Sequence, residues 1–513
     1  MKKIIFASAA FFSLLLAGCV CQNACTKVVR YEDFGAKGDG KTCDFDALIA
    51  AHNYANEHNL PVRANDDANY YISGANKTII IQTNTDWGKA NFTVDDRELE
   101  NPRAVLFQIT SRLQPYTPKG LTTLKRNQEK LDITLPVDSV IRVKNTRKKQ
   151  YIRRGLNQNP GAAQQDIFCV DKNGKVDMNA PIVWDFDQIS SVEAFPIDPD
   201  TLTVRGGTFT TIANTNPGKP IYINRNIMVR RSNTVVENVT HLMTGVAETG
   251  YPYAGFFNAS TCAYVQFKDC TLTGQRHYGH IGSAGKPVRY GTYDFGAGSA
   301  LNVSLINCRQ SNDHMNTVYW GVMGTNYCKN LNYENCKLSR FDAHCGVANA
   351  SIRNSDLGHA GVTAIGFGTF LIENTICRRH DFVGLRGDYG SSWEGKFIFR
   401  NCEFIPGNGK PVTGMIFSGF NDGAHDFGYT CYMPEEIIIE NMLIRDKNHP
   451  ENYEGPVIFG NFNHAYKDAS YVEKYPYIKT KRVILKNVRT ESGKPVRLSD
   501  NMAMFANVEV IRL

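Results

Sequence analysis

Four histidines in the second half of this 513-residue sequence stand at matching positions. Each precedes a β-branched residue by three positions, and the four are His314, His344, His359 and His380. Because side chains alternate along a β-strand, a β-branched residue that faces inward leaves its histidine facing outward. The pattern therefore predicts a column of histidines on successive strands of one face. An imidazole titrates near neutral pH, so such a column could supply a catalytic base.

The residues around these histidines would suit an elimination reaction next to a carboxyl group. That reaction needs a base for the proton beside the carboxyl group, a group that neutralises the carboxylate, and an acid for the leaving oxygen. His344 is the first candidate for the base, since Asp342 lies two residues away and could orient its ring, and His314 is the second. Arg386 is the candidate for the carboxylate and Tyr389 for the acid. The other residues expected to bind substrate are Trp320, which could stack on a sugar ring, and His359, His380, Asp342, Asp388, His277 and Arg276.

Other interpretations of the same residues stay open. The histidines could be a structural ladder that packs and bonds like any other stacked side chain. A glycoside hydrolase would need two carboxyl groups facing each other across the bond, for which Asp342 and Asp388 are a candidate pair. A non-catalytic protein could hold a glycan through Trp320, Tyr389 and Arg386. No metal site or cofactor is expected; calcium is the one ion left open, although the sequence lacks the dense carboxylate cluster that calcium would need.

A second repeat indicates the frame that would position these residues. Five asparagines are separated by 28, 19, 20 and 27 positions, and they are Asn307, Asn335, Asn354, Asn374 and Asn401. Such intervals fit one turn of a solenoid. Asparagine tolerates the left-handed backbone of a tight corner, and its amide can bond the amide of the next turn. The small residue that follows each asparagine, Cys, Ser or Thr, is expected to point into a narrow core.

The amino-terminal region carries a more specific signal. The segment DFGAKGDG (33–40) is followed by an Ala-rich helical period from about Cys43 to His58, which Asp44 could cap and Pro61 would stop. This arrangement resembles the opening segment of the pectate-lyase-like superfamily. The resemblance implies an all-β fold, a right-handed parallel β-helix whose amino-terminal helix covers the open end of the coil. It also implies a protein that cleaves or binds polysaccharides.

Taken together, the resemblance and the residues predict a polysaccharide lyase that acts on a uronate-containing chain. The basic charge and the His/Arg/Tyr set favour a glycosaminoglycan such as chondroitin, with a pectin-like chain as the alternative. The net charge is +7, and seven basic residues fall between Arg142 and Arg154. Because few aromatic residues interleave with them, we expect a solvated face or an acidic polysaccharide as partner and no nucleic acid.

The coil pattern is interrupted, but no linker divides the chain. Residues 110–163 depart from the repeat and are predicted to be an insertion that could form one wall of a cleft. The longest loop between the repeats, residues 274–295, is rich in residues that bond sugars, and loops on a rigid scaffold are common places for sites. The sequence thus predicts one β-helix domain over residues 19–513, expected to be monomeric.

The first residues are typical of an exported lipoprotein. Two lysines precede an apolar run at residues 4–16, which is too short to span a membrane, and the run ends in Leu-Ala-Gly-Cys19. This ending resembles the bacterial lipobox, which implies removal of residues 1–18 and lipidation of Cys19. The protein is then expected in the cell envelope, in the periplasm or at the outer membrane, attached to the membrane by lipid alone. Of its 14 cysteines, four follow the Asn or Asp of the repeat and are expected to be stacked, buried thiols, namely Cys270, Cys308, Cys336 and Cys402; no structural zinc is expected.

Overall fold

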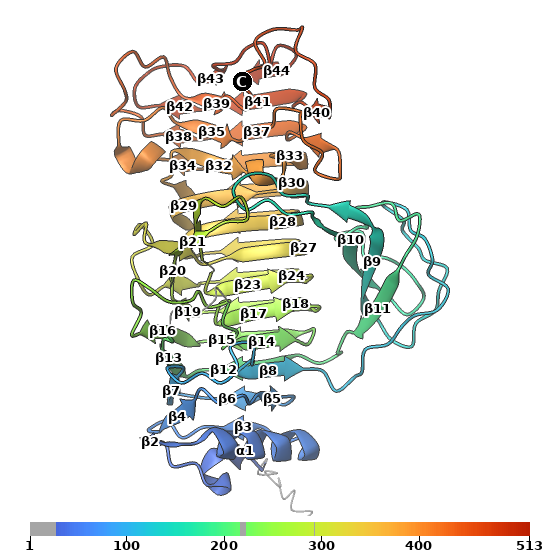
Figure 1. The fold of residues 1–513 in the computed structure, drawn as a ribbon, viewed down its shortest axis with the longest axis vertical. Coiled ribbons are helices and arrows are strands. Elements are labelled where there is room, and N and C mark those ends of the chain that lie inside the picture. Colours follow the sequence, from blue (N-terminus) through green and yellow to red (C-terminus); the bar gives the residue numbers. More distant parts are fainter. Residues whose placement is uncertain (1–26, 216–221, 292) are drawn as a thin grey trace, which may run out of the picture.

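The computed structural model describes residues 27–215, 222–291 and 293–513. Within them, 35 strands belong to one sheet that coils around a long axis, and each turn pairs in parallel with the next (Figure 1). This is the right-handed parallel β-helix predicted from the sequence. Its main ladder contains β12 (Leu202–Arg205), β15 (Thr234–Glu237), β18 (Ala263–Lys268), β24 (Leu301–Ile306), β27 (Gly324–Glu334), β28 (Lys337–Arg353), β30 (Gly366–Glu373), β33 (Trp393–Arg400), β37 (Glu436–Glu440), β41 (Arg482–Lys486) and β44 (Glu509–Arg512).

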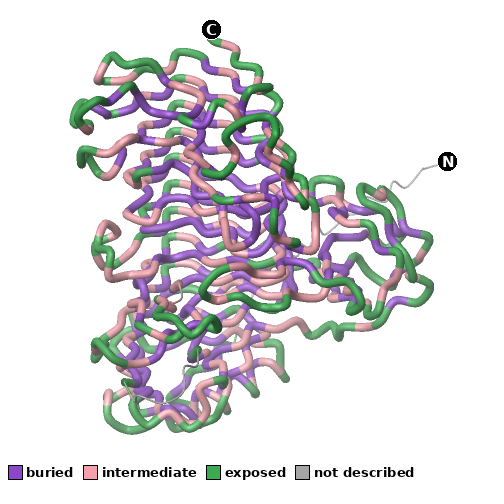
Figure 2. Tube along the Cα trace, turned by 45° about the horizontal axis from the view of Figure 1, so that its top comes forward, coloured by how far each residue is buried: buried purple, intermediate pink, exposed green. Residues whose placement is uncertain are grey.

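Other ladders complete the turns. The second contains β4 (Asn69–Ser73), β7 (Asn91–Asp95), β13 (Thr208–Ile212), β16 (Thr240–Thr244), β19 (Thr271–Leu272), β25 (Arg309–Gln310), part of β28, β29 (Asp356–Ala364), β31 (Ile376–Cys377), β34 (Glu403–Phe404), β38 (Leu443–Ile444) and β42 (Arg489–Thr490). A third contains β5 (Ile79–Ile81), β8 (Phe107–Thr110), β14 (Ile227–Arg230), β17 (Phe257–Ser260) and β23 (Phe295–Gly298). In the later turns, β29 also pairs with β32 (Asp381–Leu385), and the pairing goes on through β35 (Met415–Ser418), β39 (Val457–Phe459) and β43 (Arg497–Ser499). Alternate residues point inward, and Figure 2 shows buried residues along the length of the coil.

The predicted helix covers the amino-terminal end of the coil. Helix α1 (Phe45–His58) buries Phe45, Leu48, Ala51 and Ala55 against the first turns (Figure 1). It ends at Asn59, whose backbone is left-handed. The Asp44 side chain does not cap the helix as predicted. Its carboxylate instead accepts the backbone N–H groups of Lys37, at 2.6 Å, and Tyr71, at 3.2 Å, so it ties the chain before the helix to the coil.

The predicted asparagine ladder is confirmed. The five asparagines of the repeat all have φ between 48° and 54°. The Nδ2 atom of Asn335 donates to Oδ1 of Asn307 at 2.9 Å, and Asn374 bonds Asn354 in the same way at 2.9 Å. The run breaks once, because Asn354 donates to the Glu334 carboxylate at 2.6 Å. It also extends to the last turns through Asn441 and Asn487.

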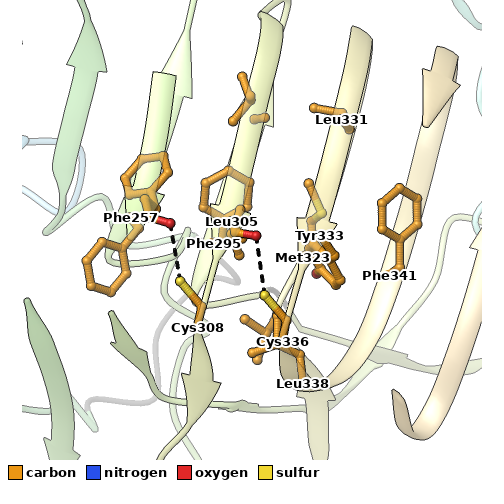
Figure 3. Close-up of a cluster of buried hydrophobic side chains, with 14 of the residues drawn as sticks. Phe257, Phe295, Leu305, Cys308, Met323, Leu331, Tyr333, Cys336, Leu338 and Phe341 are labelled. Carbon is orange, nitrogen blue, oxygen red and sulfur yellow. Dashed lines mark hydrogen bonds between the residues drawn. The ribbon is translucent and has the colours of Figure 1, made fainter. Parts of the chain in front are cut away.

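The thiols after the asparagines point into the core, as predicted. Cys308 and Cys336 lie side by side on neighbouring turns, among buried aromatic and aliphatic side chains (Figure 3). The Cys336 thiol donates to the carbonyl oxygen of Leu305 at 3.3 Å, so each thiol contacts the backbone of the preceding turn. The cysteines within the described ranges are free rather than disulfide-bonded.

A lobe interrupts the coil between β8 and β12 and projects from one side of it (Figures 1 and 2). It contains a three-stranded antiparallel sheet with the order β10 (Ala162–Val170), β9 (Ser139–Gln150) and β11 (Ser191–Pro196). The lobe has a hydrophobic core of its own. It therefore extends well beyond residue 163, the predicted end of the insertion, because residues 162–170 pair with β9 instead of returning to the coil.

Charged side chains attach the lobe to the coil. The ammonium group of Lys329 on β27 lies 2.8 Å from the Asp166 carboxylate on β10, and both side chains are buried. At the surface, Arg126 of the lobe bonds Glu394 on β33 at 2.9 Å. The lobe is thus fixed against the coil rather than linked to it only by its two ends.

Residues 1–18 and Cys19 lie outside the described residues, so the predicted export signal and lipidation stay predictions. Among the helices of the described ranges, none is long and apolar enough to cross a membrane.

Candidate functional site

A cleft of about 530 Å³ lies where the coil, the lobe and a hairpin meet. Strands β17, β23, β27 and β28 line it together with the hairpin of β21 (Tyr278–Ile281) and β22 (Pro287–Tyr290). The lobe contributes Arg153 from the loop between β9 and β10, the hairpin contributes Arg289, and Arg386 follows β32. We call it the arginine cleft after these three residues. The described residues that line it include no aspartate or glutamate.

Small and aromatic residues shape the rest of the arginine cleft. Gly296, Ala297 and Gly298 of β23 leave its wall low, so that a ligand could approach the backbone closely. Aromatic side chains line other parts of it, namely Tyr222, Tyr290, Tyr293 and Trp320. The Tyr293 ring lies against Gly324 so closely that a Cβ atom there would collide with it. Low polar walls with aromatic faces suit a sugar ring better than a compact apolar ligand.

Two of the three cleft arginines, Arg153 and Arg386, pair with carboxylates that do not line the cleft. Arg386 Nη1 lies 3.1 Å from both carboxylate oxygens of Asp342, and its Nη2 lies 2.8 Å from Asp388. Arg153 contacts the same Asp388 oxygen at 2.8 Å, and Arg340 contacts Asp342 at 3.0 Å. Three guanidinium groups therefore face two carboxylates, which leaves an excess of positive charge beside the cleft.

Asp342 is an anchor for this network. Its side chain is fully buried, and it also accepts hydrogen bonds from the Tyr293 hydroxyl and, at 2.7 Å, from the Thr363 hydroxyl. Burial alone would raise its pKa, but the charges of Arg340 and Arg386 outweigh burial and hold the pKa well below the usual range. Asp342 is therefore ionised and fully engaged.

His344 lines the arginine cleft, but Asp342 does not orient its ring as predicted. Its Nδ1 lies 2.9 Å from the side-chain oxygen of Asn326. An amide oxygen can only accept, so the imidazole proton is on Nδ1 and Nε2 keeps a lone pair. Burial, and then the charge of Arg386, lower the pKa of His344 to about 4. The ring is therefore neutral at neutral pH and could accept a proton.

The predicted column of four histidines is wrong. Val362, the residue three positions after His359, pairs with Val383 on β32 and with Phe341 on β28. Val347, the corresponding residue after His344, pairs instead with β27 and β30 on the main ladder. The reason is that β28 passes from one ladder to the other between Asp342 and Ala343, so His344 lies on a different face.

The other three histidines do not line the arginine cleft. The Nε2 atom of His314 lies 3.5 Å from Asp356, and the ring of His359 bonds the carbonyl oxygen of Tyr319 at 2.9 Å. His380 is half-exposed, with its Nε2 3.6 Å from Asp381. These contacts resemble the structural role that the sequence left open as an alternative.

The remaining predicted residues divide between the cleft and its surroundings. Trp320 lines the cleft, and its Nε1 donates to the Tyr293 hydroxyl at 2.8 Å. Tyr389 does not line the cleft but is buried next to His344, and the two rings meet edge-on with their centroids 5.4 Å apart. Burial raises the pKa of Tyr389. The His277 ring bonds the carbonyl oxygen of Thr317 at 3.2 Å. Arg276 lines a second cleft instead.

Several residues of the cleft were missed by sequence reasoning. They are Arg153, Arg289, Tyr293 and Asn326. Arg340, which does not line the cleft but pairs with Asp342 beside it, was missed as well. Arg153 belongs to the basic run of the insertion, and Tyr293 to the loop rich in sugar-binding residues. The sequence therefore indicated the segments that contain them, but not these two residues. Nothing in the sequence indicated Asn326 and Arg340, because their positions depend on how β27 and β28 stack.

The described residues contain no group of three or more His, Cys, Asp and Glu side chains that could hold a metal ion. The predictions about calcium and other cofactors stay predictions.

Comparison with known proteins places the chain by its fold. No protein-family model matches the sequence, and no curated protein matches it. Among solved structures, the tailspike gp49 from Pseudomonas phage LKA1 has a TM-score of 0.53 at 12% identity, covering 94% of this chain and 84% of that chain. The tailspike gp61 of Pseudomonas phage phi297 has a TM-score of 0.52 at 13% identity, covering 93% of this chain and 83% of that chain. The gp54 tailspike of Acinetobacter baumannii bacteriophage AP22, in complex with capsular saccharide, has a TM-score of 0.52 at 9% identity, covering 94% of this chain and 79% of that chain.

Identities this low establish the fold alone. Together with the ladders, they define the chain as a right-handed parallel β-helix protein.

Proposed function

We propose that the arginine cleft binds an acidic polysaccharide and that the protein cleaves it by β-elimination at a uronate. The observation that carries this proposal is the lining of the cleft, where three arginines and no carboxylate surround a neutral histidine. Such a lining favours an anionic ligand through its electrostatic field. Arginine is also the side chain whose planar fork matches a carboxylate or sulfate.

Arg153 and Arg386 are the residues that we expect to bind the uronate carboxylate. Both contact the same oxygen of Asp388, so this one carboxylate cannot neutralise the two of them. A substrate carboxylate would complete the charge balance. Holding it there lowers the cost of the negative charge that develops when the neighbouring carbon loses its proton.

His344 is the residue that we expect to move the proton. Its Nε2 takes the proton from the carbon that bears the carboxyl group, and the electrons of that C–H bond form a double bond as the bond to the leaving oxygen breaks. The protonated Nε2 can then return the proton to that oxygen. The low pKa of His344 suits this return, and a bound carboxylate beside Arg386 would make the ring more basic for the first transfer. Tyr389, the predicted acid, is less suited because it is buried behind the ring.

The network also argues against hydrolysis by paired carboxyl groups. That mechanism needs one free carboxyl group on each side of the bond. Asp342 accepts bonds from two arginines and two hydroxyl groups, and Asp388 is held by Arg153 and Arg386. Neither faces the cleft as a free group. Binding without cleavage is the second candidate, and the AP22 tailspike, whose structure holds a capsular saccharide, supports a polysaccharide ligand for this fold.

The test is the appearance of unsaturated uronate, followed by its ultraviolet absorbance, on a panel of acidic polysaccharides. We favour a glycosaminoglycan such as chondroitin as substrate and include pectin-like chains. On the best substrate, His344→Ala should lower turnover about 10³-fold while the melting temperature barely changes. His380→Ala is the matched control, because it removes a half-exposed histidine outside the cleft. We expect it to keep full activity.

Three results would contradict parts of this proposal. Reducing ends without unsaturated uronate would show a hydrolase. Retardation of the protein by a glycan in a gel, with no product, would show a binding protein. Full activity of the His344→Ala variant would remove His344 from the mechanism while leaving the lyase reaction itself in place.

We also propose that the protein is held at the cell envelope by a lipid on Cys19, as the lipobox-like ending indicates. Metabolic labelling with a radioactive fatty acid should mark the wild-type chain. It should not mark a Cys19→Ser variant, and a labelled variant would contradict the assignment.

A further inference from the structure

A second cleft, of about 180 Å³, lies beside the arginine cleft. Its polar and aromatic lining includes Tyr251, Tyr253, Tyr278, Tyr319, Arg276 and Asn312. We call it the tyrosine cleft. It is smaller than the arginine cleft, and aromatic faces make up much of its wall. Clefts of this kind, apolar faces with a few placed polar groups, are the usual form of small ligand sites.

Three tyrosine hydroxyl groups of the tyrosine cleft are unused by the described part of the protein, whereas the side chains of Thr273, Gln275 and Asn312 are hydrogen-bonded within it. Within the described residues, the hydroxyl groups of Tyr251, Tyr278 and Tyr319 have no hydrogen-bond partner, whereas that of Tyr253 accepts the backbone N–H of Asn214 at 3.0 Å. Three phenols therefore keep donors and acceptors for a ligand. A sugar hydroxyl needs such partners on the edge of its ring, while its C–H face can lie on an aromatic ring.

Arg276 gives the tyrosine cleft a positive charge. Its Nε is buried without a hydrogen-bond partner among the described residues. Its nearest acidic partner is Glu248, whose carboxylate lies 3.7 Å from Nη2 and is 92% exposed. An ion pair this exposed is worth little. An anionic group of a ligand could therefore replace Glu248 at small cost.

A single layer of side chains separates the two clefts. Tyr319 and Trp320 are neighbours on β26 (Tyr319–Gly321), yet Tyr319 lines the tyrosine cleft and Trp320 lines the arginine cleft. Tyr278 and Tyr290 pair across the hairpin with ring centroids 6.2 Å apart, and they also line opposite clefts. A polysaccharide that occupies one cleft would therefore have neighbouring sugar units close to the other.

We propose that the tyrosine cleft is a second sugar-binding site, which holds an anionic unit of the same chain away from the point of cleavage. Arg276 binds the carboxylate or sulfate of that unit, and the tyrosines contact its ring and hydroxyl groups. This inference rests on the proposed function, because the arginine cleft must bind the chain first. The second site would make the protein prefer long chains, since two linked contacts reinforce each other.

The experiment measures binding without cleavage. The parent protein carries His344→Ala, and its affinity is determined for a long acidic polysaccharide and for a disaccharide cut from it. Adding Arg276→Ala should weaken binding of the polymer about tenfold, and it should reduce the preference for polymer over disaccharide. Adding Tyr319→Phe, which removes one free hydroxyl, should give a smaller loss in the same direction.

Arg489→Ala is the control for the loss of one positive charge. Arg489 is exposed on β42, far along the coil from both clefts, and the variant should bind the polymer like the parent. Circular dichroism and melting temperature confirm that each variant is folded.

The outcomes separate the two proposals. If the parent binds no acidic chain, both the proposed function and this inference fail. If the parent binds but Arg276→Ala changes nothing, or weakens polymer and disaccharide by the same factor, only the second site fails.

Discussion

The asparagine ladder and the arginine cleft are built on the same coil in opposite ways. In the ladder, each asparagine repeats the backbone angle of the one before it, and most also bond the amide one turn before, as Asn374 does with Asn354 at 2.9 Å. In the cleft, no contact repeats. Arg153 comes from the lobe, Arg289 from a hairpin and Arg386 from the end of a strand.

This difference explains why the two regions tolerate change differently. A ladder distributes its stability over many equivalent, solvent-exposed bonds, so each one contributes little. The cleft concentrates charge in a few buried contacts, where loss of one group leaves others without a partner. The variants below test this contrast in order of the expected loss of folding free energy.

The largest effect is expected for Asp342→Ala. This change leaves Arg340 and Arg386 without the carboxylate that lies between them, and it should lower the free energy of unfolding by about 4 kcal/mol. Denaturant unfolding measures it. Asp313→Ala is the control, because the Asp313 side chain is 66% exposed and no arginine or lysine in the described ranges pairs with it. Its carboxylate accepts the local backbone N–H of Met315 at 2.9 Å and lies 3.7 Å from His314. A loss for Asp342→Ala as small as that of the control would show that the network does not stabilise the fold.

Lys329→Met should have the next largest effect, about 3 kcal/mol. The change leaves the buried Asp166 carboxylate with only two backbone donors, the N–H groups of Ile167 and Val183. Lobe and coil should then separate more readily, which limited proteolysis of the lobe would reveal. Lys329→Met combined with Asp166→Asn should recover part of the loss, because the uncompensated buried charge is gone. The recovery is incomplete, because Ile167 and Val183 bond different carboxylate oxygens and the amide keeps only one of them as an acceptor. If the double variant is no better than the single one, the uncompensated charge is not the cause.

The asparagine ladder and the arginine cleft also differ in how far the sequence predicted them. The ladder could be predicted because its cause is local: an asparagine that adopts a left-handed corner carries the same information in every turn. The histidine column failed because its register depends on β28, which changes ladders after Asp342. Arg153 and Arg289 could not be placed, since nothing local determines where a lobe or a hairpin meets the coil. His344, Arg386 and Trp320 were predicted and do line the cleft, but for reasons of residue type rather than of geometry.

The pH dependence of stability provides a third test. The pKa of His344 is lowered to about 4 in the folded protein, whereas in the unfolded chain it should be near 6.5. The unfolded state therefore binds a proton first as the pH falls. The neutral His344 ring therefore contributes fully to the free energy of unfolding above about pH 6.5. This contribution is lost as the pH falls from about 6.5 to 4, and we expect the loss to be about 2 kcal/mol because the side chain is partly exposed to solvent.

Unfolding free energies of the wild type and His344→Gln, compared at about pH 7 and about pH 4, isolate this contribution. The wild type should lose more stability than the variant on acidification. Equal losses would mean that the ring is not desolvated as its low pKa requires. A nuclear magnetic resonance titration should likewise show one imidazole that titrates near pH 4 and is missing from the variant.

The smallest effect is expected in the ladder itself. Asn374→Ala keeps the backbone at φ 48° without the stabilising amide and removes two exposed hydrogen bonds, one to Asn354 and one from Asn401, so it should cost about 1.5 kcal/mol. Asn374→Gly removes both bonds but accepts the backbone angle, and it should cost about half as much. Asn408→Ala is the matched control, because Asn408 is exposed with φ 56° but lies outside the ladder. The difference between the two alanine variants is the contribution of the two ladder bonds. If that difference is zero, asparagine is favoured at these positions only because it tolerates the left-handed backbone of the corner, and the bonds between stacked amides add nothing to stability.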